Sequence, residues 1–194
     1  MRQSKWVSLA AWSGAWLLIS SCSTSVQQYQ STQPEFDLAA YFDGPAIAWG
    51  MVQDYNQKVT RRFCVELQGR WQQQQGTLEE TFYFDDGETD QRTWRLTRLA
   101  EHQYSGEADD VIGTAVGEQQ GFALQWQYQL IVTIDGEDYQ FELDDWMFQL
   151  DEYRLFNRTK MKKFGLTVAE ITLFFDKESP LRQCQPKAQA TAGG

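Results

Sequence analysis

Residues 122–132 read Phe-Ala-Leu-Gln-Trp-Gln-Tyr-Gln-Leu-Ile-Val. Large apolar side chains occupy every second position from Phe122 to Val132, and most positions between them are glutamine. Because successive side chains of a strand point to opposite faces, this period of two predicts a β-strand with one apolar and one neutral polar face. An Asp135-Gly136 pair follows and predicts a tight hairpin turn, since glycine accepts a positive φ.

The same alternation recurs elsewhere in the chain. It is visible in residues 59–67 and 78–84, and a second Asp-Gly pair, Asp86-Gly87, follows the latter. Residues 36–42 are predicted as a short helix or turn, and residues 157–164, where the alternation breaks, as a short helix or basic loop. Roughly nine strands joined by short turns predict an all-β antiparallel meander. One apolar face per strand favours closure into a β-barrel, with a two-sheet β-sandwich as the alternative.

The N-terminus has the pattern of a bacterial secretion signal. Arg2 and Lys5 precede an apolar stretch from Trp6 to Ile19, and the small residues Ser20 and Ser21 follow. A basic start, a short apolar centre and small residues before a cleavage point are typical of signal peptides, so residues 1–21 are predicted to be one. The alternatives are an ordinary cleaved signal or an uncleaved anchor, in which the next residue, Cys22, has no special role.

The segment Ile19-Ser20-Ser21-Cys22 resembles the lipobox of bacterial lipoproteins. This resemblance implies that the Cys22 thiol receives a diacylglyceryl group and becomes the new N-terminus, so that the protein is attached to a membrane through this anchor. Ser23 follows Cys22 in place of an aspartate. By the sorting rules of such lipoproteins, this implies the periplasmic side of the outer membrane.

The remaining chain divides into three parts. Residues 22–34 are rich in Ser, Thr and Gln and are predicted to form a flexible tether. Residues 35–178 are predicted to form a single β-barrel domain, and residues 179–194 a disordered tail. The whole chain carries a net charge of −10, which becomes −12 once Arg2 and Lys5 are removed. An acidic domain of this kind is not expected to bind nucleic acid, whose phosphates need a basic surface.

Little in the sequence points to catalysis. The single histidine, His102, stands in a polar segment and is predicted to be an exposed loop residue. No Gly-x-Ser-x-Gly elbow is present, and the acidic residues do not follow a calcium-loop spacing. We therefore predict no catalytic residue, no metal and no cofactor, although an enzyme acting on lipids stays open as the least expected class.

Two cysteines remain after Cys22. Cys64 lies in an early predicted strand, and Cys184 follows the last one. If the first and last strands meet, as they do when a sheet closes, the two could form a disulfide. Two unpaired thiols are the alternative, because sequence does not set the Cα separation that a disulfide requires.

Paired aspartates and tryptophans are the candidate ligand-binding residues. Asp85-Asp86, Asp109-Asp110 and Asp144-Asp145 each place one carboxylate on each face of a strand, and the first pair is explained by its turn. An inward aspartate needs a partner, and Arg92, Arg95, Asn157 and Arg158 are available. Tryptophans at strand positions either fill the core or line a cavity for an acyl chain. The predicted candidates are Trp49, Trp94, Trp126, Trp146, Asp109, Asp145, Arg95, Asn157 and Arg158.

Several motifs together resemble a known family. They are residues 82–88 (Phe-Tyr-Phe-Asp-Asp-Gly-Glu), Trp94, residues 106–113 (Gly-Glu-Ala-Asp-Asp-Val-Ile-Gly), residues 144–147 (Asp-Asp-Trp-Met), Asn157-Arg158 and Lys163-Phe164-Gly165. With the lipobox they resemble the DUF3833 family of proteobacterial lipoproteins, over about residues 43–176. The resemblance implies an uncharacterised envelope lipoprotein with a lipocalin-like barrel. It also implies a link to modification of membrane fatty acids, because genes of this family often lie among genes for that chemistry.

Two functions follow as the main expectations. The first is a lipid-anchored protein whose barrel binds a lipid or small apolar ligand. The second is a structural or accessory lipoprotein with a packed barrel, which acts through protein partners of unknown identity. Whether the barrel interior is hollow or packed distinguishes them.

Overall fold

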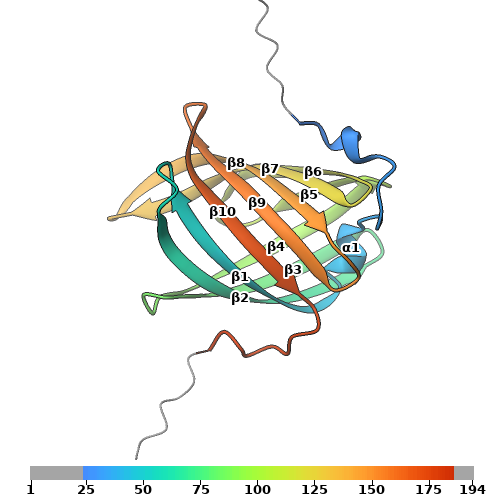
Figure 1. Ribbon diagram of the computed structural model, residues 1–194, viewed down its shortest axis with the longest axis horizontal. Coiled ribbons are helices and arrows are strands. Elements are labelled where there is room, and N and C mark those ends of the chain that lie inside the picture. Colours follow the sequence, from blue (N-terminus) through green and yellow to red (C-terminus); the bar gives the residue numbers. More distant parts are fainter. Residues whose placement is uncertain (1–23, 186–194) are drawn as a thin grey trace, which may run out of the picture.

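The computed structural model describes residues 24–185. The predicted signal peptide, the lipidation of Cys22 and the end of the predicted tail lie outside these residues. The described chain forms ten antiparallel strands that close into a barrel in chain order (Figure 1). The strands are β1 (Gly44–Asp54), β2 (Val59–Gln72), β3 (Gln75–Phe84), β4 (Thr89–Ala100), β5 (Gln103–Glu107), β6 (Val111–Gln120), β7 (Ala123–Ile134), β8 (Glu137–Gln149), β9 (Arg154–Lys163) and β10 (Leu166–Asp176).

Closure of the sheet occurs between the first and last strands. β1 pairs with β2 on one side and with β10 on the other, where Trp49 lies opposite Phe174. This confirms the all-β meander and the lipocalin-like barrel, and it excludes the β-sandwich. The predicted hairpin around Asp135-Gly136 is also present: both residues have a positive φ, and β7 pairs with β8 along its whole length.

The prediction of a short helix or basic loop over residues 157–164 is wrong. Residues 154–163 form β9, which pairs with β8 and β10. Its inward face carries Leu155, Asn157 and Thr159, all of them buried. Two polar residues on the buried face interrupt the apolar alternation, and this hid the strand from a hydrophobicity pattern.

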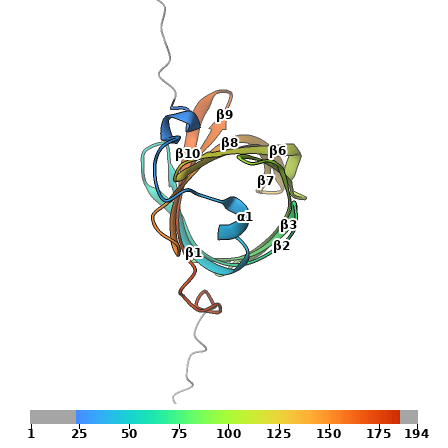
Figure 2. The ribbon, with the colours of Figure 1, turned by 90° about the vertical axis from the view of Figure 1, so that its right-hand side faces the viewer.

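One end of the barrel is closed by the short helix α1 (Leu38–Tyr41), as Figure 2 shows. The helix begins at Asp37, whose side chain accepts a hydrogen bond from Ala40 N at 3.1 Å. Tyr41 Oη donates to Tyr153 O at 2.9 Å, while Leu38 and Phe42 are buried in the core. The helix is therefore fastened to the wall by polar contacts and fills the opening with apolar side chains.

Residues 24–34 are packed against the barrel, which corrects the predicted flexible tether for this part of the chain. Val26–Tyr29 form a 3₁₀ helix, in which Val26 is buried. The Tyr29 ring lies 5.1 Å from that of Phe122. Thr32 Oγ1 accepts a hydrogen bond from Phe122 N at 3.2 Å. The composition of this segment is polar overall and does not predict that it packs on the barrel, because only Val26, Tyr29 and Thr32 make these contacts.

The described part of the predicted tail, residues 179–185, is attached covalently to the barrel. Cys184 forms a disulfide with Cys64 of β2, with an S–S distance of 1.98 Å and a Cα–Cα distance of 5.3 Å. The Cα distance lies within the range of ordinary protein disulfides. The predicted disorder is therefore corrected for residues 179–184, which are attached to the barrel through Cys184.

Candidate ligand cavity

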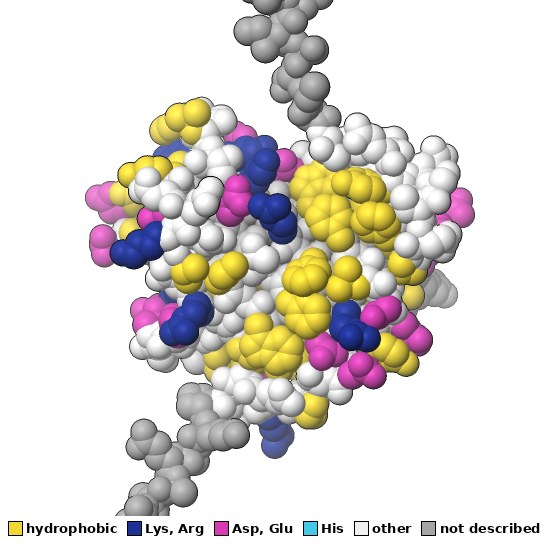
Figure 3. All heavy atoms as spheres, in the orientation of Figure 1, with side chains coloured by type: hydrophobic (Ala, Val, Ile, Leu, Met, Phe, Trp, Pro, Cys, Tyr) yellow, Lys and Arg dark blue, Asp and Glu magenta, His cyan; other side chains and the backbone are white. Residues whose placement is uncertain are grey.

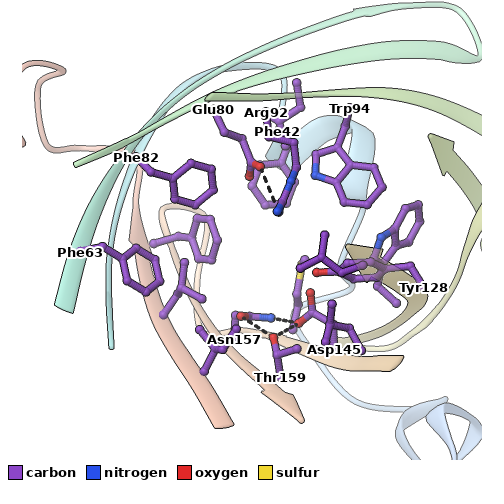
Figure 4. A pocket seen from close by; sticks show the side chains of 18 of the residues that line it. Phe42, Phe63, Glu80, Phe82, Arg92, Trp94, Tyr128, Asp145, Asn157 and Thr159 are labelled. Atoms are coloured by element: carbon purple, nitrogen blue, oxygen red, sulfur yellow. Dashed lines mark hydrogen bonds and ion pairs between the residues drawn. The ribbon is translucent and has the colours of Figure 1, made fainter. Parts of the chain in front are cut away.

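The barrel is hollow. A cavity of about 220 Å³ lies inside it and is bounded at one end by Leu38 and Phe42, which belong to α1 and the residue after it (Figure 4). Most of its lining side chains are apolar, among them Leu78, Phe82 and Leu173. Such a space can hold an apolar molecule or part of one.

Four of the predicted candidates line the cavity: Trp94, Trp126, Asp145 and Asn157. The two indole rings meet edge to face, with centroids 5.7 Å apart. Each of these residues stands on the inward face of its strand and is buried. These four positions therefore line one interior cavity, and a role in ligand binding stays a prediction for them.

The other candidates lie outside the barrel, which corrects their placement. Asp109 pairs with Arg95 at 3.2 Å, and Arg158 pairs with Glu170 at 3.0 Å, all on the exposed surface. Arg95 and Arg158 directly follow the inward residues Trp94 and Asn157. Adjacent side chains of a strand point to opposite faces, so both members of such a pair cannot line one cavity.

Trp49 and Trp146 belong to apolar surfaces on the outer wall. Trp49 is 39% exposed on β1, and the Trp146 ring stacks on that of Phe148. Figure 3 shows apolar side chains gathered on the outer face of the molecule. Their rings contribute to the outside of the barrel and not to the ligand cavity.

Asp145 is the most enclosed acidic residue that was predicted. Its Oδ1 accepts hydrogen bonds from Asn157 Nδ2 and, at 2.9 Å, from Thr159 Oγ1. Burial raises the pKa of Asp145 to about 6, although these two hydrogen bonds act in the opposite direction. Its neighbour Asp144 points outward and pairs with Lys162 at 3.1 Å.

Sequence reasoning missed Glu80 and treated Arg92 only as a possible partner of an aspartate. The two residues face each other across β3 and β4, and Arg92 Nη1 lies 3.9 Å from Glu80 Oε2. Arg92 also donates to Asp110, from Nη2 at 2.6 Å and from Nε at 2.8 Å. Asp110, and not the predicted Asp109, is therefore the member of its pair that reaches toward the barrel interior. The sequence register could have shown that Glu80 points inward, because Glu80 stands between Leu78 and Phe82 on the same face of its strand.

Glu80 is held in an unfavourable environment for a carboxylate. Burial raises its pKa to about 7, and the negative charges of Asp110 and Asp145 add to this effect, while Arg92 and a hydrogen bond from Trp94 oppose it. Oε2 of Glu80 accepts no hydrogen bond from the described residues. Burial and the charge of Asp145 also raise the pKa of Tyr128, so its phenol stays protonated. Figure 4 shows Glu80 and Arg92 on one wall of the cavity, with Asp145, Asn157 and Thr159 on the other.

Other kinds of site find no support in the described residues. Between residues 24 and 185, no cluster of three or more His, Cys, Asp or Glu side chains is placed to hold a metal ion. Within the same residues, no helix has the length and apolar character needed to cross a membrane. His102 is half-buried in the turn between β4 and β5 and does not line the cavity.

Comparison with known proteins places the chain in a family without assigning it an activity. No curated protein matches this sequence. The family described as "Protein of unknown function (DUF3833)" matches residues 16–177, which is most of the chain and includes every strand of the barrel. The protein therefore belongs to the DUF3833 family.

Proposed function

We propose that this protein is a lipid-anchored envelope protein whose barrel binds a lipid or small apolar ligand. The observation that carries the proposal is the apolar cavity of about 220 Å³ within a closed barrel. A barrel packed throughout would favour the alternative, an accessory protein that acts through protein partners. Such a partner would use the outer apolar surface around Trp49, Phe156 and Phe174, whereas the cavity favours ligand binding.

The end of the barrel opposite α1 is the entrance that the structure provides. The hairpin turns between β1 and β2, β3 and β4, β7 and β8, and β9 and β10 all lie at this end (Figure 1). No described helix covers it. Val52, Phe63 and Phe84 line the cavity and are only partly buried. A ligand would therefore enter between these side chains and advance toward α1.

The anchor is the second part of the proposal. A basic start, an apolar stretch and small residues before Cys22 support acylation of its thiol, and Ser23 supports delivery to the periplasmic side of the outer membrane. The Cys64–Cys184 disulfide supports export, because disulfides persist in oxidising compartments such as the periplasm. A role near membrane fatty-acid modification rests on the family resemblance and would bring apolar molecules within reach of the barrel.

Mass spectrometry of the mature protein tests the anchor. We expect the chain to begin at Cys22 and to carry the added mass of a diacylglyceryl group and an N-terminal acyl chain. Several acyl chains, at about 0.8 kcal/mol per buried methylene, hold a protein on a bilayer without help from its surface. A mature chain that begins at Ser23 or later would contradict the proposal.

Fluorescence titration tests binding in the cavity. The neutral apolar dye N-phenylnaphthylamine is expected to bind saturably and to gain fluorescence on entering the barrel. Val52→Trp places a large ring at the entrance and is expected to weaken binding by about tenfold or more, because overpacking a filled site costs roughly 1–3 kcal/mol.

Gln53→Trp is the matched control for this titration. Gln53 lies beside Arg158 and Glu170 on the outer wall, so its replacement adds the same ring without entering the cavity. We expect its dye affinity to equal that of the wild type. Absence of saturable binding, or equal affinities in the two tryptophan variants, would argue against the cavity as the binding site.

A further inference from the structure

We infer that the ligand of this cavity is an amphiphile with a protonated amine, and that Glu80 and Asp145 receive its head group. This inference rests on the proposed function, and it names the ligand class. It also excludes a free fatty acid as the preferred ligand of the site.

The first argument is the balance of charge. The guanidinium of Arg92 pairs with Asp110 and lies 3.9 Å from Glu80, and a third carboxylate, Asp145, faces it from the opposite wall of the cavity. Among the described residues that line the cavity, Arg92 is the only cation. When the carboxylates are ionised, the interior thus carries surplus negative charge. Buried charges are normally paired, and a ligand cation would supply the missing partner.

The second argument is that one carboxylate oxygen of Glu80 lacks a hydrogen-bond donor. Glu80 Oε2 has no donor among the described residues, and Arg92 Nη1 at 3.9 Å is too distant to be one. A buried acceptor without a donor costs free energy, which a donor on the ligand would recover. An ammonium group has three N–H donors and no acceptor, so it suits the carboxylate oxygens of Glu80 and Asp145, which face the cavity from opposite walls.

The third argument is that the Nε and Nη2 edge of the Arg92 guanidinium is already paired. Its Nε and Nη2 both donate to Asp110, at 2.8 and 2.6 Å. A fatty-acid carboxylate would have to displace Asp110 from this pair or enter as a fourth negative group. Either event is unfavourable, because like charges in a poorly solvated site repel strongly.

The apolar part of the ligand fits the remaining lining. Trp94, Trp126 and Leu130 line the same cavity as the polar groups, so a chain can extend along the barrel from a head group held at Glu80. At about 220 Å³, the cavity is smaller than the roughly 300–1,000 Å³ of pockets that enclose drug-sized ligands. It therefore suits a short chain, or a single chain of a larger amphiphile whose remainder stays outside.

Three probes with the same alkyl chain test the inference. The full chain is titrated with octylamine, octanol and octanoate at about pH 8, where a carboxyl with the raised pKa of Glu80 is ionised, and tryptophan fluorescence reports binding. We expect octylamine to bind about tenfold more tightly than octanol, since a hydrogen bond between charged groups is stronger than one from a neutral hydroxyl. Octanoate is expected to bind most weakly.

Two isosteric variants separate the cavity from the acidic surface. Glu80→Gln is expected to remove the advantage of octylamine over octanol and to leave octanol binding nearly unchanged. Glu79→Gln is the matched control: it changes the net charge equally on the neighbouring residue, which faces outward and pairs with Arg70. It should bind all three probes as the wild type does. Asp145→Asn gives a second test of the same site, with the same expected loss for octylamine.

The outcomes separate the inference from the proposed function. Tightest binding by octanoate, lost in Arg92→Gln, would overturn the amine inference and leave ligand binding intact. Equal octylamine affinities in Glu80→Gln, Asp145→Asn and Glu79→Gln would also overturn it, because the amine would then be attracted by the acidic surface alone. Failure of all three probes to bind would overturn the proposed function itself.

Discussion

Glu80→Gln is expected to stabilise the protein at about pH 8 and to change its stability little at about pH 4.5. Burial raises the pKa of Glu80 from 4.5 to about 7, so the folded state binds this proton more tightly than the unfolded state does. The free energy of unfolding is therefore not reduced by Glu80 below pH 4.5, where the carboxyl is protonated in both states. It falls as the pH rises toward 7, because the unfolded state loses this proton first. At about 1.4 kcal/mol per pH unit, the loss reaches up to about 3 kcal/mol, which glutamine avoids.

Urea unfolding at the two pH values, followed by tryptophan fluorescence, measures this effect. Glu79→Gln is again the control. Its side chain is 52% exposed and pairs with Arg70 at 3.1 Å, so its removal should change the free energy of unfolding little at either pH. Destabilisation of Glu80→Gln at about pH 8 would show that the attraction to Arg92 outweighs the cost of burial, contrary to the expected sign.

Replacing both Cys64 and Cys184 by serine is expected to lower the free energy of unfolding by about 4–5 kcal/mol. The disulfide joins residues separated by 120 positions, so it removes many conformations from the unfolded chain. The folded barrel should remain, because Cys184 lies beyond β10 and all ten strands pair without it. Urea unfolding of the variant and of the oxidised wild type measures the difference.

A reducing agent provides the control for this second prediction. It should destabilise the wild type by the same amount as the double replacement, and it should leave the double variant unchanged. A decrease in the free energy of unfolding of less than about 1 kcal/mol would contradict the prediction, because a disulfide that closes so long a loop is expected to contribute several times more. The disulfide would then serve only to hold the segment after β10 against the wall.

The fold was predictable wherever apolar and polar residues alternate. Residues 122–132 and the Asp135-Gly136 turn predict the hairpin of β7 and β8 that is observed. β9 was not predictable in this way, because its buried face includes Asn157 and Thr159. These polar side chains are stabilised by contacts with Asp145 on the neighbouring strand, and such contacts are visible only once the register is known.

The kinds of residue that line the cavity, tryptophan and aspartate, were predictable, but several of the individual residues were not. Trp49 was placed inside as a tryptophan at a strand position, yet its small neighbours Ala48 and Gly50 are the residues that face inward. Gly50 leaves room for the Phe63 ring: a Cβ at Gly50 would lie 2.4 Å from it. Glu80 was missed because no residue of its own strand could pair with a buried carboxylate, so nothing in that segment marked Glu80 as an inward residue. Its partner, Arg92, comes from the next strand.

The contacts of residues 24–36 determine how a mechanical load applied at the N-terminal side reaches α1. Between residue 24 and α1, the chain is bound to the turn between β6 and β7 by Tyr29 and Thr32, and by Phe36 N, which donates to Gly121 O at 2.7 Å. A pull applied at residue 24 is therefore resisted first by these contacts and by the barrel wall. These contacts would have to break before such a pull displaces α1 from the closed end of the barrel.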